Sequence, residues 1–123
     1  MLKTEFGIEE GANMVLAGNI PIGCGLSSSS AFVISITEIF CQLFSIQMEY
    51  RDLAYLCQKI ENEALGITCG LLDQYGIILS KKDHIMLIDF QDDSIEYVKG
   101  PPEKIVYDAI DKIKTIYLGS QIG

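Results

Sequence analysis

Two glycines and four hydroxyl side chains stand together in the segment PIGCGLSSSS, residues 21–30, directly before a long apolar stretch. Glycine lets backbone amides approach an anion, and the amino end of a helix favours negative charge. The segment is therefore a candidate phosphate cradle. Because no glycine is followed by lysine, it is not a Walker A loop, and Mg2+ is the natural source of positive charge. On general grounds, a glycine turn followed by a serine helix cap explains the segment equally well.

Three carboxylates could complement such a cradle: Asp73, Glu61 and Glu63. Phosphoryl transfer requires a group that directs the proton of the nucleophile and oxygen ligands for a metal ion. However, an aspartate after an apolar pair is usually a helix cap, and a glutamate near a helix end is usually solvated. Glu61 and Glu63 would lie about 200° apart on a helix, so they cannot share one face. Residue types alone favour these structural interpretations.

Composition limits the classes of partner. The chain has 123 residues, of which 49% are hydrophobic, and it carries 17 acidic against 9 basic residues for a net charge of -8. This charge opposes binding to nucleic acid and to anionic membranes. A nucleotide could still bind if local amides and a divalent cation overcome the unfavourable field. We therefore expect no nucleic-acid partner and no membrane partner.

The cysteines and the amino terminus give two further expectations. No two of the four cysteines form a C-x-x-C pair and His84 is the only histidine, so a zinc site has little support, and we expect reduced, mostly buried thiols. The first residues lack the apolar core of a secretion signal, and the longest apolar stretch, residues 31–44, contains Glu38 and Gln42. These patterns predict a cytoplasmic protein.

Hydrophobic periodicity and turn residues predict the elements that position these groups. They are, in chain order, a short buried strand at residues 14–17, a helix over 31–44 whose start the serines mark, a helix over 49–64, a loop between Gly66 and Gly70, a hairpin with strands at 85–89 and 95–98, and an amphipathic helix over 105–117. His84 would begin a strand, and Arg51 would be a surface charge on a helix.

The string over residues 21–31 resembles the second conserved motif of the GHMP kinases, the superfamily of galactokinase, homoserine kinase, mevalonate kinase and phosphomevalonate kinase. Its pattern is Pro-x-x-x-Gly-Leu-Ser-Ser, and Ser30 stands where many relatives have alanine. The resemblance implies that this loop wraps the phosphates of ATP and that its last serine, Ser29, helps to bind Mg2+. The implied cofactor-binding residues are Gly23, Cys24, Gly25, Leu26, Ser27, Ser28 and Ser29.

A second segment, CGLLDQYG at residues 69–76, looks like the Cys-Gly-Ile-Met-Asp-Gln-Phe segment of galactokinases. The similarity continues into HIMLIDF and back into LCQKIENEALGITCG. In mevalonate-type relatives the glycine and the aspartate are one residue closer together, which favours galactokinase. The resemblance implies that Asp73 is the catalytic carboxylate near the anomeric hydroxyl of the sugar. It also implies that Glu61, rather than Glu63, is the Mg2+ ligand paired with Ser29.

The resemblance also implies a fold and a reaction. The fold is α+β, with residues 1–123 forming a single partial GHMP kinase amino-terminal domain, like ribosomal protein S5 domain 2, in which helices pack on a mixed sheet. The reaction is phosphorylation of galactose by ATP, with Mg2+, to galactose 1-phosphate. A related kinase for N-acetylgalactosamine, arabinose or a uronic acid, and a non-catalytic sugar and ATP sensor, remain alternatives, as does a plain structural domain with an incidental anion loop.

Some parts of a galactokinase are not in this sequence. The family's upstream signature, rich in Gly-Arg-Val-Asn and Gly-Glu-His-Thr-Asp-Tyr, does not occur, nor does its third, glycine-rich motif. These parts supply an arginine beside the catalytic aspartate, most sugar contacts and one wall of the cleft. We therefore expect little or no kinase activity from this chain alone. Apolar surface that normally packs on the missing parts would favour self-association of the fragment.

Overall fold

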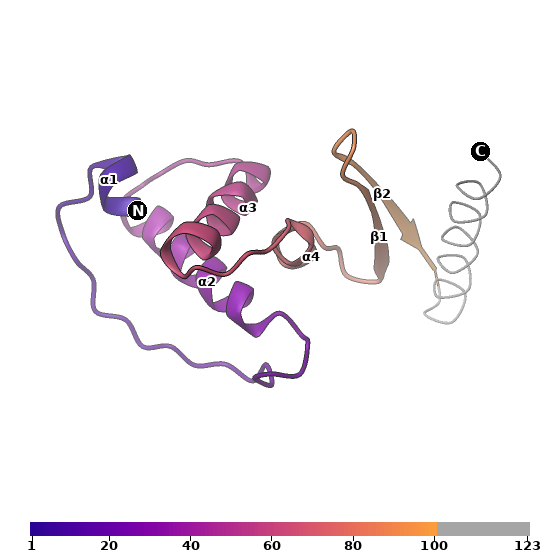
Figure 1. Ribbon diagram of the computed structural model, residues 1–123, viewed down its shortest axis with the longest axis horizontal. Helices are drawn as coiled ribbons and strands as arrows, with labels where there is room; N and C mark the ends of the chain where they lie inside the picture. The colour runs from indigo at the N-terminus through magenta and orange to yellow at the C-terminus, as the bar shows by residue number, and fades with distance from the viewer. Residues whose placement is uncertain (101–123) are drawn as a thin grey trace. The chain divides into compact units, whose positions relative to one another are not determined.

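The computed structural model describes residues 1–100, which fall into two compact units, one spanning Met1–Leu79 and the other beginning at Ser80 (Figure 1). The first unit contains helices and the second contains a β-hairpin. The helix that the sequence predicts at residues 105–117 lies outside the described residues. The two units together confirm the predicted α+β class.

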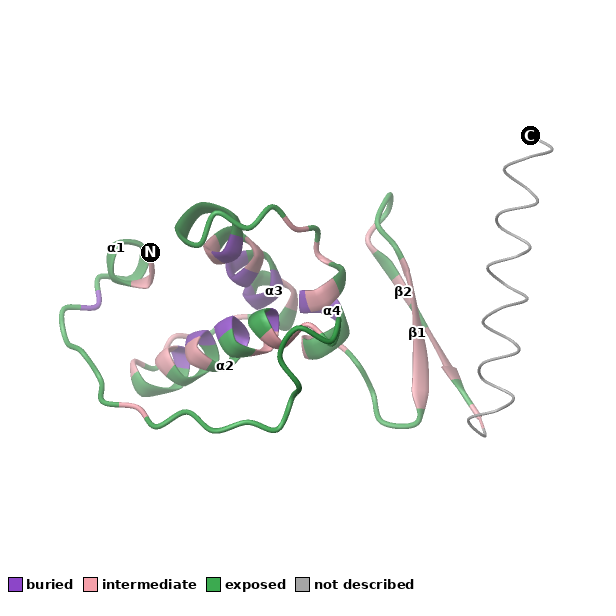
Figure 2. Ribbon diagram, turned by 60° about the horizontal axis from the view of Figure 1, so that its bottom comes forward, coloured by how far each residue is buried: buried purple, intermediate pink, exposed green. Residues whose placement is uncertain are grey.

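The first unit has five helical elements. They are α1 (Leu2–Phe6), α2 (Ser28–Leu43), α3 (Tyr50–Lys59), the π-helical turn η1 (Ile60–Ala64) and α4 (Leu72–Ile78). The buried faces of α2 and α3 meet, as Figure 2 shows in purple, and α4 contacts both helices. The core that joins α2 to α3 consists of Val33, Ile34, Leu53 and Cys57. Ile60 of η1 and Ile78 of α4 pack against this core.

The predicted helices over residues 31–44 and 49–64 are confirmed as α2 and as α3 followed by η1. Helix α2 forms despite its β-branched residues because it buries one apolar face against α3. Its hydroxyl groups bond within the helix: Thr37 donates to the carbonyl of Val33 at 2.8 Å, and Ser35 donates to that of Ala31 at 2.7 Å. The buried hydroxyl of Thr37 is thereby paired within its own helix.

The predicted buried strand at residues 14–17 is wrong. The segment lies in a coil without helix or strand between α1 and α2, which Figure 2 shows as mostly exposed. The side chain of Val15 is 97% exposed. A strand requires a neighbour to pair with its backbone. Within residues 1–100, the two strands of the hairpin pair with each other, so this segment has no strand beside it.

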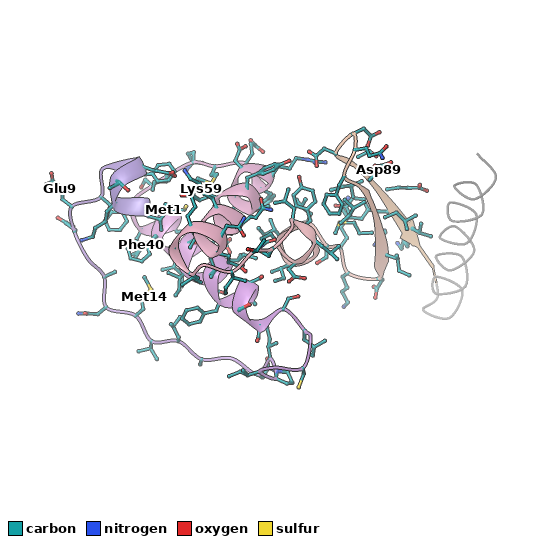
Figure 3. All side chains as sticks on the ribbon, viewed as in Figure 1. Met1, Glu9, Met14, Phe40, Lys59 and Asp89 are labelled. Atoms are coloured by element: carbon teal, nitrogen blue, oxygen red, sulfur yellow. The ribbon has the colours of Figure 1, made fainter. Side chains whose placement is uncertain are left out.

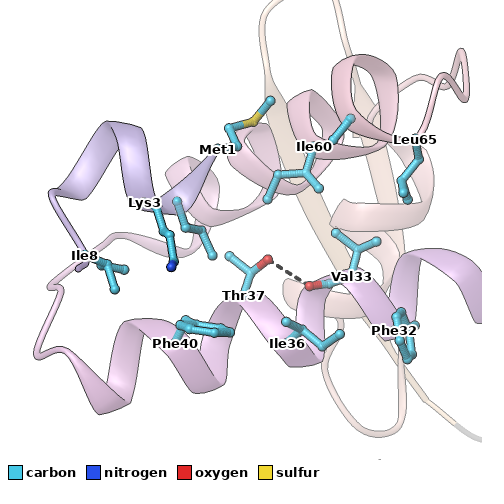
Figure 4. Close-up of a pocket in the computed structure, with 12 residues that line it drawn as sticks. Met1, Lys3, Ile8, Phe32, Val33, Ile36, Thr37, Phe40, Ile60 and Leu65 are labelled. Atoms are coloured by element: carbon cyan, nitrogen blue, oxygen red, sulfur yellow. Dashed lines mark hydrogen bonds between the residues drawn. The ribbon is translucent and has the colours of Figure 1, made fainter. Parts of the chain in front are cut away.

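Helix α1 is joined to the rest of the first unit by charge and by apolar contact. Lys59 near the end of α3 forms an ion pair with Glu5 of α1, and Figure 3 shows the Lys59 side chain beside this helix. An apolar cavity of about 370 Å³ lies beneath α1, between α2 and η1 (Figure 4). Its walls include Ile8, Val33 and Ile60. None of the predicted site residues lines this cavity.

The second unit contains β1 (His84–Asp89) and β2 (Ser94–Lys99), which pair antiparallel from His84 with Lys99 to Asp89 with Ser94. This confirms the predicted hairpin, and His84 begins its strand as expected. Side-chain oxygens support the turn, since the amide of Ser94 donates to Asp92 Oδ1 at 2.9 Å. The sheet of the described residues is this one antiparallel pair, whereas the family resemblance implies a mixed sheet.

Candidate active site

Glu61 is a buried carboxylate at the junction of three helical elements. Its side chain is 1% exposed. Its Oε1 accepts a hydrogen bond from Gln74 Nε2 at 3.0 Å, and its Oε2 lies 3.7 Å from the thiol of Cys69. Both of these partners are neutral. A buried carboxylate is costly unless a cation compensates it, so Glu61 is a strong candidate for a metal ligand and is not the solvated residue that its type suggests.

The neighbouring glutamate is placed differently. Glu63 is exposed, whereas Glu61 is buried. The two residues belong to η1, where the amide of Leu65 donates to the carbonyl of Ile60 at 3.3 Å, a spacing of five residues. Turns of this kind occur often at functional sites. This difference in burial agrees with the expectation that Glu61, rather than Glu63, is the Mg2+ ligand.

Asp73 lies in the first turn of α4, half-buried and directly before Gln74. The side-chain amide of Gln74 is hydrogen-bonded to Glu61, so α4, which carries Asp73, is linked to η1, which carries Glu61. Both carboxylates also act on Cys69. Burial raises the pKa of its thiol, and the negative charges of Glu61 and Asp73 raise it further. The two predicted carboxylates therefore lie around one cysteine.

Two amide side chains hold the backbone of Cys69 in place. Gln58 Nε2 donates to the backbone carbonyl of Cys69 at 3.0 Å, and the backbone amide of Cys69 donates to Asn62 Oδ1 at 3.0 Å. Gln58 and Asn62 are four residues apart, so they can project toward the same side of a helix. These bonds fix the loop that precedes α4. Sequence reasoning missed this arrangement, and the four-residue spacing of two amides was the signal that could have revealed it.

The predicted phosphate loop has an unusual backbone. Gly23, Gly25 and Ser27 have φ values of 73°, 69° and 56°, so left-handed residues alternate with others along the loop. Where left-handed residues alternate with right-handed ones, successive amides can turn toward one side and form an anion-binding concavity. Glycine adopts this conformation without strain, whereas Ser27 does not share that freedom. The loop is mostly exposed.

The serine run does not behave as a simple helix cap. Ser27 occupies the cap position of α2, but its hydroxyl makes no capping hydrogen bond. Ser29 is exposed at the start of α2, whereas Ser30 is buried. These observations weaken the capping alternative and leave the hydroxyl of Ser29 accessible to a ligand.

The structure brings together some of the predicted site residues. A hydrogen bond from Gln74 links Glu61 to the helix that carries Asp73. The side-chain partners of Glu61 within residues 1–100 are Gln74 and Cys69, so Ser29 is not among them. Within residues 1–100, no group of three or more histidine, cysteine, aspartate or glutamate side chains is placed to hold a metal. Glu61 and Ser29 supply hard oxygen donors, which fit Mg2+ if water and phosphate oxygens complete its shell.

The helices of the described region were also compared with the requirements of a membrane span. None of those within residues 1–100 is both long and apolar enough to cross a bilayer.

Comparison with known proteins identifies similar sequences. Residues 1–81 match the family described as GHMP kinases N terminal domain. The chain is also 38% identical over 88 residues to a galactokinase of Pyrococcus furiosus. That alignment covers 72% of this chain and 25% of the relative, so the matched part of the chain spans a quarter of the length of that protein. The family match over residues 1–81 includes the glycine and serine loop and the two carboxylate segments described above.

Proposed function

Because the chain belongs to the GHMP kinases, we propose that its protein transfers the γ-phosphoryl group of ATP to the anomeric hydroxyl of galactose, giving galactose 1-phosphate and ADP. The observation that carries this proposal is the buried carboxylate of Glu61, bonded to the residue next to Asp73. This bond links the element that carries a candidate metal ligand to the element that carries a candidate catalytic carboxylate. The similarity to a galactokinase supports the choice of sugar.

The proposed roles follow from the chemistry of phosphoryl transfer. Backbone amides over residues 23–29 would hold the phosphates of ATP, and the left-handed residues Gly23 and Gly25 support this role. Glu61 and Ser29 would hold Mg2+, which supplies positive charge to the transferred phosphoryl group. Asp73 would orient the sugar hydroxyl and accept its proton, early or late in the transfer.

The remaining requirements of the reaction lie outside this region. The domain assignment that we propose is one partial amino-terminal GHMP kinase domain over residues 1–123. A positive charge beside Asp73 and most contacts to the sugar would come from parts of the protein that match the remaining length of its relatives. For this reason the activity is assigned to the full-length protein, with ATP and galactose as its small-molecule partners.

An ADP-release assay on the full-length protein tests the reaction. With Mg2+, ATP and a panel of sugars, we expect galactose to give the highest turnover. Asp73→Asn should lower kcat at least about 100-fold, since general acid–base groups contribute factors of this size. The matched control is Asp52→Asn, at an exposed position of α3. Turnover that does not depend on galactose, or an Asp73→Asn protein as active as the parent, would refute the assignment.

Alkylation of cysteine tests the phosphate loop independently of activity. Cys24 is exposed within the loop, whereas Cys41 and Cys57 are buried. We expect iodoacetamide to modify Cys24 first and Mg2+ with ATP to slow this modification, as measured by mass spectrometry. Mg2+ with adenosine, which lacks phosphates, serves as the control. Equal rates with ATP and with adenosine would show that the loop does not bind phosphates.

A further inference from the structure

We propose that Gln74 is a positioning residue, which occupies Oε1 of Glu61 and thereby leaves Oε2 as the oxygen that binds the metal. This inference rests on the proposed function, because it concerns the metal site of the same reaction. It assigns a role to a residue that the family resemblance left without one. The evidence is the arrangement of hydrogen bonds around the two side chains.

The amide of Gln74 is completely buried and incompletely paired. Its side chain is 0% exposed. Its Nε2 donates to Glu61 Oε1 at 3.0 Å and lies 3.8 Å from the sulfur of Cys69. Its Oε1 is the buried side-chain atom without a hydrogen-bond partner among the described residues. Such buried unpaired acceptors are uncommon and call for an explanation.

The charge of Glu61 explains this orientation. A carboxylate only accepts hydrogen bonds, so the amide nitrogen of Gln74 must face it. Rotating the amide by half a turn would direct its carbonyl oxygen at the carboxylate, and two acceptors would then oppose each other. Gln74 therefore leaves its own oxygen unpaired in order to hold Glu61. Local unfavourable features of this kind are expected at functional sites.

The two oxygens of Glu61 consequently differ. Oε1 receives a strong amide hydrogen bond, whereas Oε2 faces the Cys69 thiol at 3.7 Å, a weak and distant donor. A cation bound to Oε2 would replace this weak contact and leave the hydrogen bond from Gln74 to Oε1 intact. Because Gln74 directly follows Asp73 in α4, the same hydrogen bond sets the position of the metal ligand relative to the segment of Asp73.

Metal binding by a Gln74→Met variant tests the proposal. Methionine has nearly the same length as glutamine but lacks the amide. We expect its affinity for Mn2+ in the presence of ATP, measured by electron paramagnetic resonance, to fall about tenfold or more, as is typical when a group that orients a metal ligand is lost. Gln47→Met, at an exposed position, is the matched control and should stay within about twofold of the parent.

The comparison is made on folded protein, with the folded fraction of each variant measured by circular dichroism. A purely structural role would lower the folded fraction and leave the affinity of the remaining folded protein unchanged. Equal affinities of Gln74→Met and the parent would overturn the inference while the proposed function stands. A parent that binds no Mn2+ with ATP would refute the metal role in the proposed function, and this inference with it.

A second measurement does not depend on metal binding or on the folding of Gln74→Met. In the parent, we expect nuclear magnetic resonance to show slow solvent exchange of the Gln74 side-chain amide protons. Glu61→Gln should shift their resonances, because it replaces the charged acceptor. Fast exchange together with resonances that Glu61→Gln does not change would show that the hydrogen bond is absent, and the positioning role would then be excluded.

Discussion

Replacing Glu61 by glutamine should stabilise the chain in the absence of metal while removing its proposed metal ligand. The carboxylate is 1% exposed and its partners are the neutral side chains of Gln74 and Cys69. Glutamine has nearly the same shape but no charge. The buried charge itself is therefore the main quantity that the substitution changes.

The expected magnitude is a balance of three contributions. Removing the desolvation penalty of a buried carboxylate gains several kcal/mol, whereas losing a hydrogen bond to a charged acceptor costs about 1.5–3 kcal/mol. A glutamine at this position can also donate to the unpaired Oε1 of Gln74, which contributes about 1 kcal/mol. The net effect is a gain of about 2 kcal/mol in the free energy of unfolding.

Urea denaturation at neutral pH, followed by circular dichroism, measures this gain. With an m-value of about 1–2 kcal/mol/M, the midpoint should rise by about 1–2 M. Mg2+ with ATP at about 100 times the dissociation constant should stabilise the parent by about 2.7 kcal/mol and Glu61→Gln by much less. Glu63→Gln, at an exposed position, should change stability by less than about 0.5 kcal/mol.

The opposite result would refute the reasoning. If Glu61→Gln unfolds at lower urea than the parent without metal, the fold itself requires the charged carboxylate. Glu61 would then be a structural residue, and its burial would no longer indicate a metal site.

Two further predictions concern the core. Burial above all raises the pKa of Cys57 from 9.0 to about 11, so the unfolded chain loses its thiol proton first as pH rises. The free energy of unfolding of the parent, measured by urea titration, should therefore fall by up to about 3 kcal/mol between pH 9 and about 11, whereas that of Cys57→Ala should not show this fall. A difference in unfolding free energy between the two proteins that does not change with pH would contradict this prediction. By the same method, Leu53→Ala should lower the free energy of unfolding by about 2–5 kcal/mol, because Leu53 is buried between α2 and α3. The control Leu43→Ala, at an exposed position, should lower it by less than about 1 kcal/mol. Equal effects of the two substitutions would count against this core.

The features that were predicted correctly depend on local patterns. Apolar residues at helical spacing indicated α3, and the turn residues between two alternating segments indicated the hairpin. The strand at residues 14–17 was predicted from apolar character, but a strand also requires a partner, which no local pattern reveals. Val15 in this segment is exposed, which shows that apolar residues alone do not form a strand when no partner strand is present.

The candidate site was predictable only in part. Resemblance to a family pointed to Asp73, Glu61 and the glycine and serine loop, whose roles stay predictions. The hydrogen bond between Glu61 and Gln74 joins residues 13 positions apart on different elements, so neither residue's neighbours in the sequence announce it. The same is true of the bonds from Gln58 and Asn62 to Cys69. Pairings of this kind depend on how the helices pack.

The π-helical turn makes the site depend on the number of residues as well as on their identity. An extra residue is accommodated between Ile60 and Leu65. Deleting the exposed Ala64 would allow an ordinary helical turn and rotate the following chain by roughly 100°. Cys69 would move away from Gln58 and Asn62 although every contacting side chain was retained. A single-residue insertion or deletion in η1 would therefore change the geometry of this junction in a way that substitutions alone would not.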